Sequence, residues 1–333
     1  MTKKSKSVIG IFSEAIGLYF SNFDKFLKYM SFPVWGQIIG LALIFSITFF
    51  YTQNLPKLLE KYPNLNDIKT LIILSIFITL PGLIIYIKAF WEFLVAYGAI
   101  NSMLDNMLKS GRVYDFEAHT SLIKKRSVGF IGLWFLVGIF TLLAVFPLFW
   151  VIGGILGVYF VLIFQIFTYE QEKSPIECFK RSFELVISNF AKTFILMALV
   201  GILTYLFIPQ IINKAFEIIG LTSILSSCIK PLFTSIPLIE IPNYGIIIDT
   251  KLATLTIEAL VAQIIIQYTL PLRSILWGLW YKELSKNKEP AIKREKKTRK
   301  QRPSEKLMQE SHKKYGKKKL DTNILKRASK KDD

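Results

Sequence analysis

The chain has 333 residues, of which 52% are hydrophobic, and it carries a formal net charge of +18 at pH 7. This apolar content exceeds that of an ordinary soluble domain. Its two cysteines and two histidines exclude a disulfide scaffold and a cysteine-rich metal site, and we expect no metal and no cofactor.

Uncharged stretches identify the class of protein. Residues 29–51 and 127–169 contain no Asp, Glu, Lys or Arg. A helix rises about 1.5 Å per residue, so roughly 20 apolar residues cross the hydrocarbon core of a bilayer. These stretches are continuously apolar rather than alternating, which favours helices over a transmembrane barrel. The sequence therefore predicts a polytopic, all-α membrane protein.

The chain begins with an amphipathic segment, residues 7–28, whose apolar side chains recur every three or four positions. A second one, residues 174–192, starts at Ser174 and Pro175 and has Glu177 at the third position of a capping box. The predicted helix bundle has about six transmembrane helices, at residues 29–51, 70–87, 128–147, 150–169, 193–212 and 253–280.

The stretch from 218 to 238 is apolar but interrupted. Ser223, Ser226, Ser227, Lys230 and Pro231 break it up. We therefore predict an interfacial or re-entrant segment on the outer side rather than a seventh span.

The basic residues are distributed unevenly across the predicted membrane. The N-terminal segment and the two predicted loops on the same side carry 15 Lys and Arg residues, against six on the opposite side. Residues 281–333 add 20 more. Because cytoplasmic loops hold the excess of Lys and Arg, we expect both termini in the cytoplasm.

The two amphipathic segments align at an offset of 167 residues. Ser21-Asn22-Phe23 then matches Ser188-Asn189-Phe190, and each segment leads into a predicted span. This suggests a parallel repeat of residues 7–87 and 174–280 around the hairpin 128–169, within a membrane domain of residues 1–280. A repeat of this kind is either a transporter-like pseudosymmetry or a duplicated packing unit. The sequence favours the packing unit, because no broken helix with convergent polar groups is apparent.

The run from Ser174 to Val186, followed by Asn189 and Phe190 and a span, resembles the signature of a bacterial membrane family. That family comprises the membrane domain of glycerophosphoryl diester phosphodiesterases and related YciC-like proteins. The resemblance covers about residues 7–280. It implies a six-helix module in the bacterial inner membrane. It does not imply hydrolase activity, because the phosphodiesterase chemistry belongs to a separate barrel domain with His, Glu and Asp metal ligands.

Polar residues inside the predicted spans are candidates for function. Lys88 and Glu92 lie just past the second predicted span and four residues apart, so they can pair along one helix face. His119 is expected to be a solvated loop residue. The last span carries four intramembrane candidates, of which the glutamines are expected to bridge helices and the arginine to extend toward the membrane surface: Glu258, Gln263, Gln267 and Arg273.

Residues 281–333 form a predicted soluble, disordered tail with a net charge of +12. We expect it to contact anionic lipid, with solvation alone and RNA or ribosome binding as alternatives. Base recognition ranks lower because Tyr315 is the one aromatic residue near the charge blocks. The candidate lipid-contacting residues are Lys293, Arg294, Lys296, Lys297, Arg299, Lys300 and Arg302.

Three functions are compatible with the sequence. The leading one is a non-enzymatic membrane module that binds or organises lipids or membrane proteins. The alternatives are a small-molecule or lipid transporter with a site between the repeats, and a membrane-insertion factor with a ribosome-binding tail. No HExxH, GxSxG, Walker A or DxD arrangement occurs, so we expect no catalytic residues and no enzyme activity. The sequence predicts no particular oligomeric state.

Overall fold

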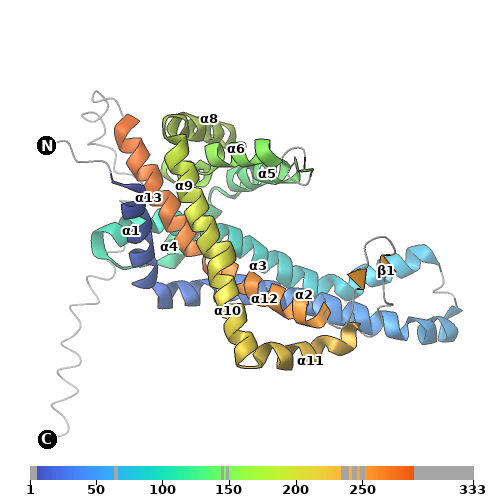
Figure 1. The fold of residues 1–333 in the computed structure, drawn as a ribbon. Helices are drawn as coiled ribbons and strands as arrows, with labels where there is room; N and C mark the ends of the chain where they lie inside the picture. The colour runs from blue at the N-terminus through green and yellow to red at the C-terminus, as the bar shows by residue number, and fades with distance from the viewer. Residues whose placement is uncertain are drawn as a thin grey trace, which may run out of the picture. The chain divides into compact units, whose positions relative to one another are not determined.

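The computed structural model describes residues 6–63, 67–143, 146–147, 150–233, 240–241, 246–247 and 252–288. Almost all of these residues are helical (Figure 1), which confirms the predicted all-α class. In chain order the elements are α1 (Val8–Phe20), α2 (Phe23–Lys61), α3 (Ile68–Ser110), α4 (Phe116–Lys124), α5 (Ser127–Leu143), α6 (Trp150–Phe160), α7 (Ile163–Tyr169), α8 (Pro175–Val186), the 3-10 helix η3 (Ile187–Asn189), α9 (Phe190–Gly201), the π-helix η4 (Ile202–Phe207), α10 (Ile208–Ile218), α11 (Leu221–Phe233), the antiparallel pair β1 (Glu240–Ile241) and β2 (Ile246–Ile247), α12 (Leu252–Tyr268) and α13 (Leu270–Lys288).

Within the described residues, five helical segments are long and apolar enough to cross a membrane: Phe23–Lys61, Ile68–Ser110, Trp150–Tyr169, Pro175–Ile218 and Leu252–Lys286. A sixth candidate is the pair α4 and α5, which is bent by 77° and whose apolar part is α5. Each of these six segments overlaps one of the six predicted spans. The chain is therefore a multi-pass membrane protein by the length and composition of its helices.

The first two helices extend well beyond their predicted spans. With 39 and 43 residues, α2 and α3 are roughly 58 and 64 Å long, about twice the hydrocarbon thickness. The sequence beyond the apolar run of α2 is rich in Leu, Lys and Glu, which are good helix formers, so the helix continues after the hydrophobic residues end.

The chain divides into two compact units. The first comprises the described parts of Met1–Asn22, Gly98–Phe194 and Ser274–Asp333, and the second comprises those of Phe23–Tyr97 and Ile195–Arg273.

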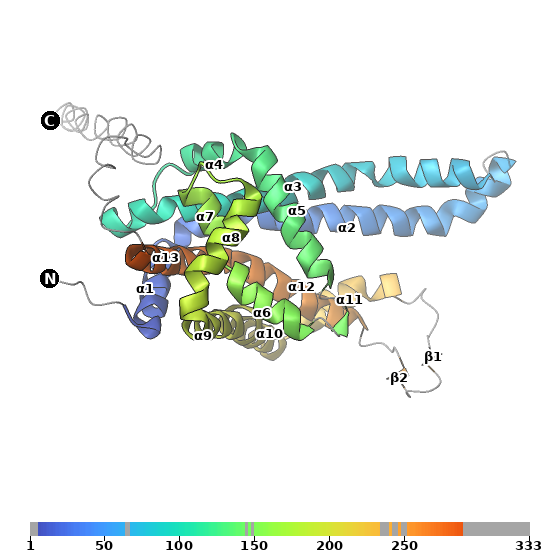
Figure 2. The same cartoon turned by 90° about the horizontal axis from the view of Figure 1, so that it is seen from above.

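In the second unit, α2 and α3 lie side by side (Figure 2). They approach closely at Gly40 and Gly82. A Cβ atom on Gly40 would lie 2.7 Å from the backbone nitrogen of Tyr86 and 2.9 Å from the carbonyl oxygen of Gly82. Gly36 and Gly40 form a GxxxG pair, the spacing that brings membrane helices into backbone contact. Only glycine therefore fits at position 40, because any Cβ atom there would clash with the backbone of α3.

The predicted amphipathic segment 7–28 does not form one continuous helix, because it is divided between α1 and the start of α2. Ser7 caps α1 by accepting a hydrogen bond from the Gly10 N–H, and the helix ends at Phe20. Asn22 is fully buried; its side chain donates to the Gly111 carbonyl at 3.1 Å and accepts from the Val113 N–H at 2.8 Å. These distant contacts hold the turn before α2, and the local sequence does not reveal them.

The second amphipathic segment repeats this local structure. Ser174 caps α8 and forms the predicted capping box with Glu177, and the α-helix is interrupted at η3 before α9 begins at Phe190. At the 167-residue offset the capping serines and the shared Ser-Asn-Phe coincide, and each buried residue of α1 matches a buried residue of α8. The buried pairs are Ile11 and Cys178, Ala15 and Ser182, and Tyr19 and Val186. The match supports a duplication, and the parallel arrangement of the two copies stays a prediction.

The fourth span is broken between α6 and α7, in the first unit. Ser182 on α8 forms hydrogen bonds with two backbone groups at this break. Its hydroxyl donates to the Tyr159 carbonyl at 2.6 Å and accepts from the Leu162 N–H at 3.3 Å. An interhelical hydroxyl thus replaces the missing helical hydrogen bonds, as the apolar surroundings require.

The interrupted stretch after α10 forms α11 in the second unit. Gly220 has a positive φ of 77° and starts the turn, and α11 has 13 residues, too few to cross a bilayer. It packs against α10 and α12. The rest of the stretch, residues 234–238, lies outside the described residues.

Candidate functional site

Among the described residues, two buried polar clusters are candidate sites, one in each unit. The Arg273 cluster, in the second unit, comprises Gln37, Tyr205, Ile266, Gln267 and Arg273. The Asn101 cluster, in the first unit, comprises Asn101, Gln165, Tyr169 and Ser274.

The Arg273 cluster forms where α12 ends and α13 begins. Pro271 has no N–H, so it interrupts the helical hydrogen bonding at this junction. Arg273 is only 8% exposed. Its Nη2 donates to the Ile266 carbonyl at 2.7 Å, and its Cζ lies 4.5 Å from the centroid of the Tyr205 ring. The arginine therefore caps the C-terminal carbonyls of α12 and is held on an aromatic face.

Two further features surround this arginine. Tyr205 belongs to the π-helix η4, a form that is rare and often found at functional sites. The buried Gln37 on α2 donates to the Pro33 carbonyl at 2.7 Å and contacts Gln267 at 3.4 Å. An interrupted helix with convergent polar groups thus exists, contrary to what the sequence indicated.

The four predicted intramembrane residues have different surroundings. Gln267 is buried and bridges α12 to α2, as predicted, whereas Gln263 is exposed, so its predicted bridging role is wrong. Glu258 is partly exposed, and its backbone carbonyl accepts from Asn213 at 3.1 Å. Arg273 was expected to extend toward the membrane surface, but it is buried because a carbonyl and a ring satisfy its guanidinium locally.

Part of the Arg273 guanidinium is available for another interaction. Its Nη1 is buried and has no hydrogen-bond partner among the described residues. A charged donor left unsatisfied in an apolar environment is costly, so it is a potential contact for an anionic or carbonyl-bearing ligand. Its chemistry is binding rather than proton transfer, because arginine stays protonated.

The Asn101 cluster connects three helices, α3, α7 and α13. Asn101 Oδ1 accepts from Ser274 at 2.8 Å and from Gln165 at 3.2 Å, and its backbone carbonyl accepts from Tyr169 at 2.7 Å. Asn101, Gln165 and Ser274 are fully buried. This cluster was not predicted from the sequence, although an asparagine and a glutamine within apolar stretches were the available signals.

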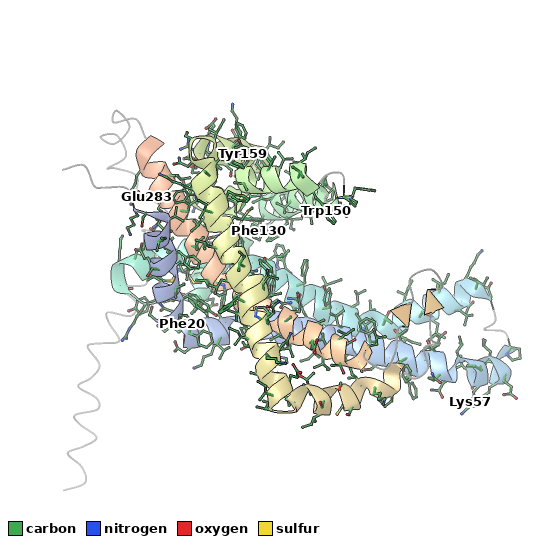
Figure 3. All side chains as sticks on the ribbon, in the orientation of Figure 1. Phe20, Lys57, Phe130, Trp150, Tyr159 and Glu283 are labelled. Carbon is green, nitrogen blue, oxygen red and sulfur yellow. The ribbon has the colours of Figure 1, made fainter. Side chains whose placement is uncertain are left out.

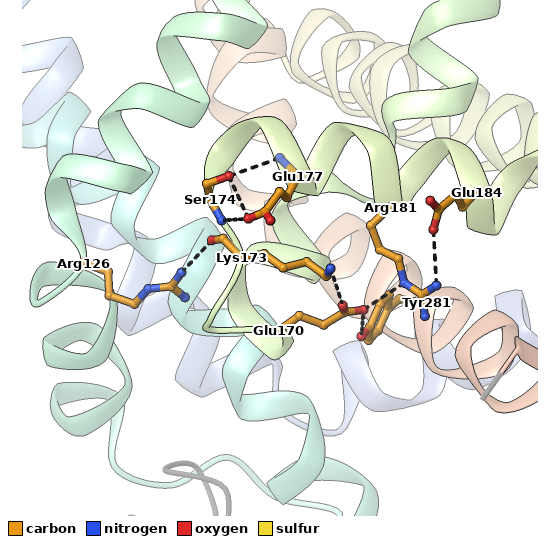
Figure 4. Close-up of polar contacts among 8 residues, drawn as sticks. All are labelled: Arg126, Glu170, Lys173, Ser174, Glu177, Arg181, Glu184 and Tyr281. Carbon is orange, nitrogen blue, oxygen red and sulfur yellow. Dashed lines mark hydrogen bonds and ion pairs between the residues drawn. The ribbon is translucent and has the colours of Figure 1, made fainter. Parts of the chain in front are cut away.

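Charged residues continue this network in the first unit (Figure 4). Glu170 accepts from the Tyr281 hydroxyl at 2.9 Å and from the Arg181 Nε at 3.3 Å, and Lys173 lies 3.6 Å from the same carboxylate. Arg126 donates to the backbone carbonyl of Lys173 at 3.4 Å. These contacts link the start of α8 to α7 and α13 and are structural.

His119 is buried, so its prediction as a solvated residue is wrong. It lies in α4, outside the apolar run of α5, and is 5% exposed. Its Nδ1 lies 2.6 Å from the Ser102 hydroxyl, and its Nε2 lies 3.1 Å from the Asn106 amide nitrogen. Because an amide nitrogen only donates, Nε2 accepts and the proton is on Nδ1, which makes the ring neutral.

We expect acid to destabilise the protein through His119. Burial lowers the pKa of His119 from 6.5 to about 4, and Asp115 opposes this shift. The folded state therefore binds the proton less readily than the unfolded chain. Its stability is complete above about pH 6.5 and is lost as the pH falls toward 4, by about 2 kcal/mol at pH 5. Unfolding measured from pH 7 to 5 should show this loss in the parent chain and not in His119→Gln. Parallel curves would contradict it.

The seven basic tail candidates, Lys293 to Arg302, lie outside the described residues. Comparison of the chain with models of protein families, with curated proteins and with solved structures finds no match. Function is therefore inferred from the chain's own residues.

Proposed function

We propose that this chain is a non-enzymatic membrane module that binds or organises lipids or other membrane proteins. The apolar surface of α3 carries the proposal. In its most apolar 18-residue window only 6% of residues are buried by the chain itself. Ile72, Ile73, Ile76 and Phe77 are all more than half exposed. Figure 3 shows side chains standing out along α2 and α3, with Lys57 toward the end of α2. Acyl chains or another membrane protein would cover such a surface.

The proposal places the chain in a bacterial inner membrane with both termini in the cytoplasm. The unequal distribution of Lys and Arg supports this orientation. The tail, with its net charge of +12, then lies beside the anionic inner leaflet. Basic residues near such a surface contribute about 1 kcal/mol each, within a Debye length of about 8 Å. The likeness of residues 174–190 to the phosphodiesterase membrane domain supports a membrane module without the hydrolase.

Reconstitution of the full chain tests this proposal. In nanodiscs with equal amounts of zwitterionic and anionic phospholipid, the extracted protein should retain lipid and enrich the anionic class. Replacing the seven basic tail candidates with Gln should abolish the enrichment, and raising the salt concentration should weaken it. The control variant, with Lys57, Lys61 and Lys69 replaced by Gln, should behave like the parent chain.

Two other results would contradict this proposal. Extraction without any retained lipid would refute lipid binding. Unchanged anionic enrichment in the tail variant, together with tail-dependent ribosome capture, would favour the membrane-insertion factor instead.

The Arg273 cluster supports a second candidate, a transporter. In many transporters, discontinuous transmembrane helices form the substrate and ion sites. A substrate flux into vesicles that Arg273→Met abolishes, while the variant remains folded, would favour transport over the scaffold.

A further inference from the structure

A pocket opens on the second unit between the start of α2 and α3. Its volume is about 350 Å³, and its wall is formed by Tyr29, Phe32, Pro33, Lys88 and Glu92. The Lys88 ammonium lies 5.6 Å from the centroid of the Phe32 ring. The pocket therefore combines one cation, one carboxylate and an aromatic wall, a size and composition suited to a small ligand group.

The position of the pocket relates it to the membrane surface. Lys28 is the last charged residue before the apolar run of α2, and Lys88 is the first one after the apolar run of α3. The apolar run of α2 therefore begins beside the pocket, and the apolar run of α3 ends beside it. Side chains that lead away from it along the two helices are apolar and 48 to 57% exposed, namely Trp35, Ile39, Ile84 and Ile87. A ligand with a polar head and apolar tails would find both parts of its site here.

The spacing between Lys88 and Glu92 determines which kind of lipid headgroup matches the pocket. Lys88 and Glu92 lie one helical turn apart, about 6 Å along α3. An anionic lipid would match the lysine and be repelled by the glutamate. A headgroup with a phosphate next to an ammonium matches both. A primary ammonium has N–H groups to donate to the carboxylate, which a quaternary one lacks.

We propose that this pocket binds the headgroup of a zwitterionic phospholipid that carries a primary ammonium, of the phosphatidylethanolamine type. Lys88 contacts the phosphate, Glu92 accepts from the ammonium, and the acyl chains lie on the exposed apolar side chains of α2 and α3. This inference rests on the proposed lipid binding and adds the class of lipid and the residues that select it.

The test compares lipids bound to the full chain in nanodiscs of phosphatidylethanolamine, phosphatidylcholine and phosphatidylglycerol in equal amounts. The chain tested carries Gln at the seven basic tail candidates, which removes the enrichment of anionic lipid by the tail. In this background, native mass spectrometry should show preferential retention of phosphatidylethanolamine. Glu92→Gln should reduce that preference about tenfold, which corresponds to about 1.4 kcal/mol. Lys88→Gln should weaken retention of all three at this site, because each has a phosphate. Glu60→Gln and Lys57→Gln, on the same helix pair outside the pocket, are the matched controls.

The outcomes separate this inference from the function on which it rests. If the parent retains lipid but Glu92→Gln leaves its selectivity unchanged, the pocket assignment is wrong and lipid binding stands. Retention of no lipid at all would refute both. Soluble phosphoethanolamine should not displace the lipid at equal concentration, since it lacks the acyl chains; efficient displacement would make a soluble ligand the occupant. Glu92→Asp keeps the carboxylate and should retain most of the preference, which guards against a folding defect in Glu92→Gln.

Discussion

Replacing Gly40 with leucine should destabilise the protein by about 3 kcal/mol. The new side chain would meet backbone atoms of Gly82 and Tyr86 on α3 at less than 3 Å, and backbone cannot move aside as a flexible side chain can. The two helices would have to separate, which removes the close contacts that membrane helices depend on in the absence of a hydrophobic driving force. Denaturant unfolding in detergent micelles measures the loss.

Gly138→Leu is the matched control. Gly138 lies in the apolar helix α5, and a Cβ atom there would meet nothing within 4 Å. Leucine also favours helix more than glycine does, by about 0.5 to 1 kcal/mol. The control should therefore be neutral or stabilising. Equal destabilisation by the two substitutions would mean that close packing of α2 on α3 is not the cause.

Replacing Asn101 with leucine should cost about 2 to 3 kcal/mol. The substitution removes the oxygen that accepts from both Ser274 and Gln165, so buried donors lose their acceptor in the core of the first unit. The loss should appear as a lower midpoint of unfolding and as faster proteolysis of the first unit. An unchanged midpoint would show that the polar cluster contributes no net stability.

Gln263→Leu provides the comparison for Asn101. It removes a side-chain amide of similar chemistry from an apolar helix, but Gln263 is exposed. Substitutions at such positions usually change stability by no more than about 0.5 kcal/mol. A large effect at Gln263 would restore the bridging role that the sequence suggested for it.

The membrane character and the positions of the long apolar segments follow from the sequence. Uncharged runs such as residues 127–169 can only be buried in a bilayer as helices, because every backbone group must be satisfied there. The start of α8 was equally predictable, because Ser174, Pro175 and Glu177 satisfy the first N–H groups of the helix through contacts three residues apart. Local interactions of this range are visible in the pattern of residue types.

The sites depend on contacts that no local pattern contains. Asn22 ends the first amphipathic helix through residues 89 and 91 positions away, and Gln37 meets Gln267 across 230 positions. Arg273 and His119 read as surface residues in the sequence, because charged and polar side chains usually are. In the structure, Arg273 contacts a backbone carbonyl and an aromatic ring, and His119 contacts a serine and an asparagine. Periodicity and hydropathy determined which segments are helices. The hydrogen-bond partners of the buried polar groups were decided only by the tertiary structure. The reason is that the desolvation cost of a buried polar group is offset by residues that are its neighbours in space rather than in sequence.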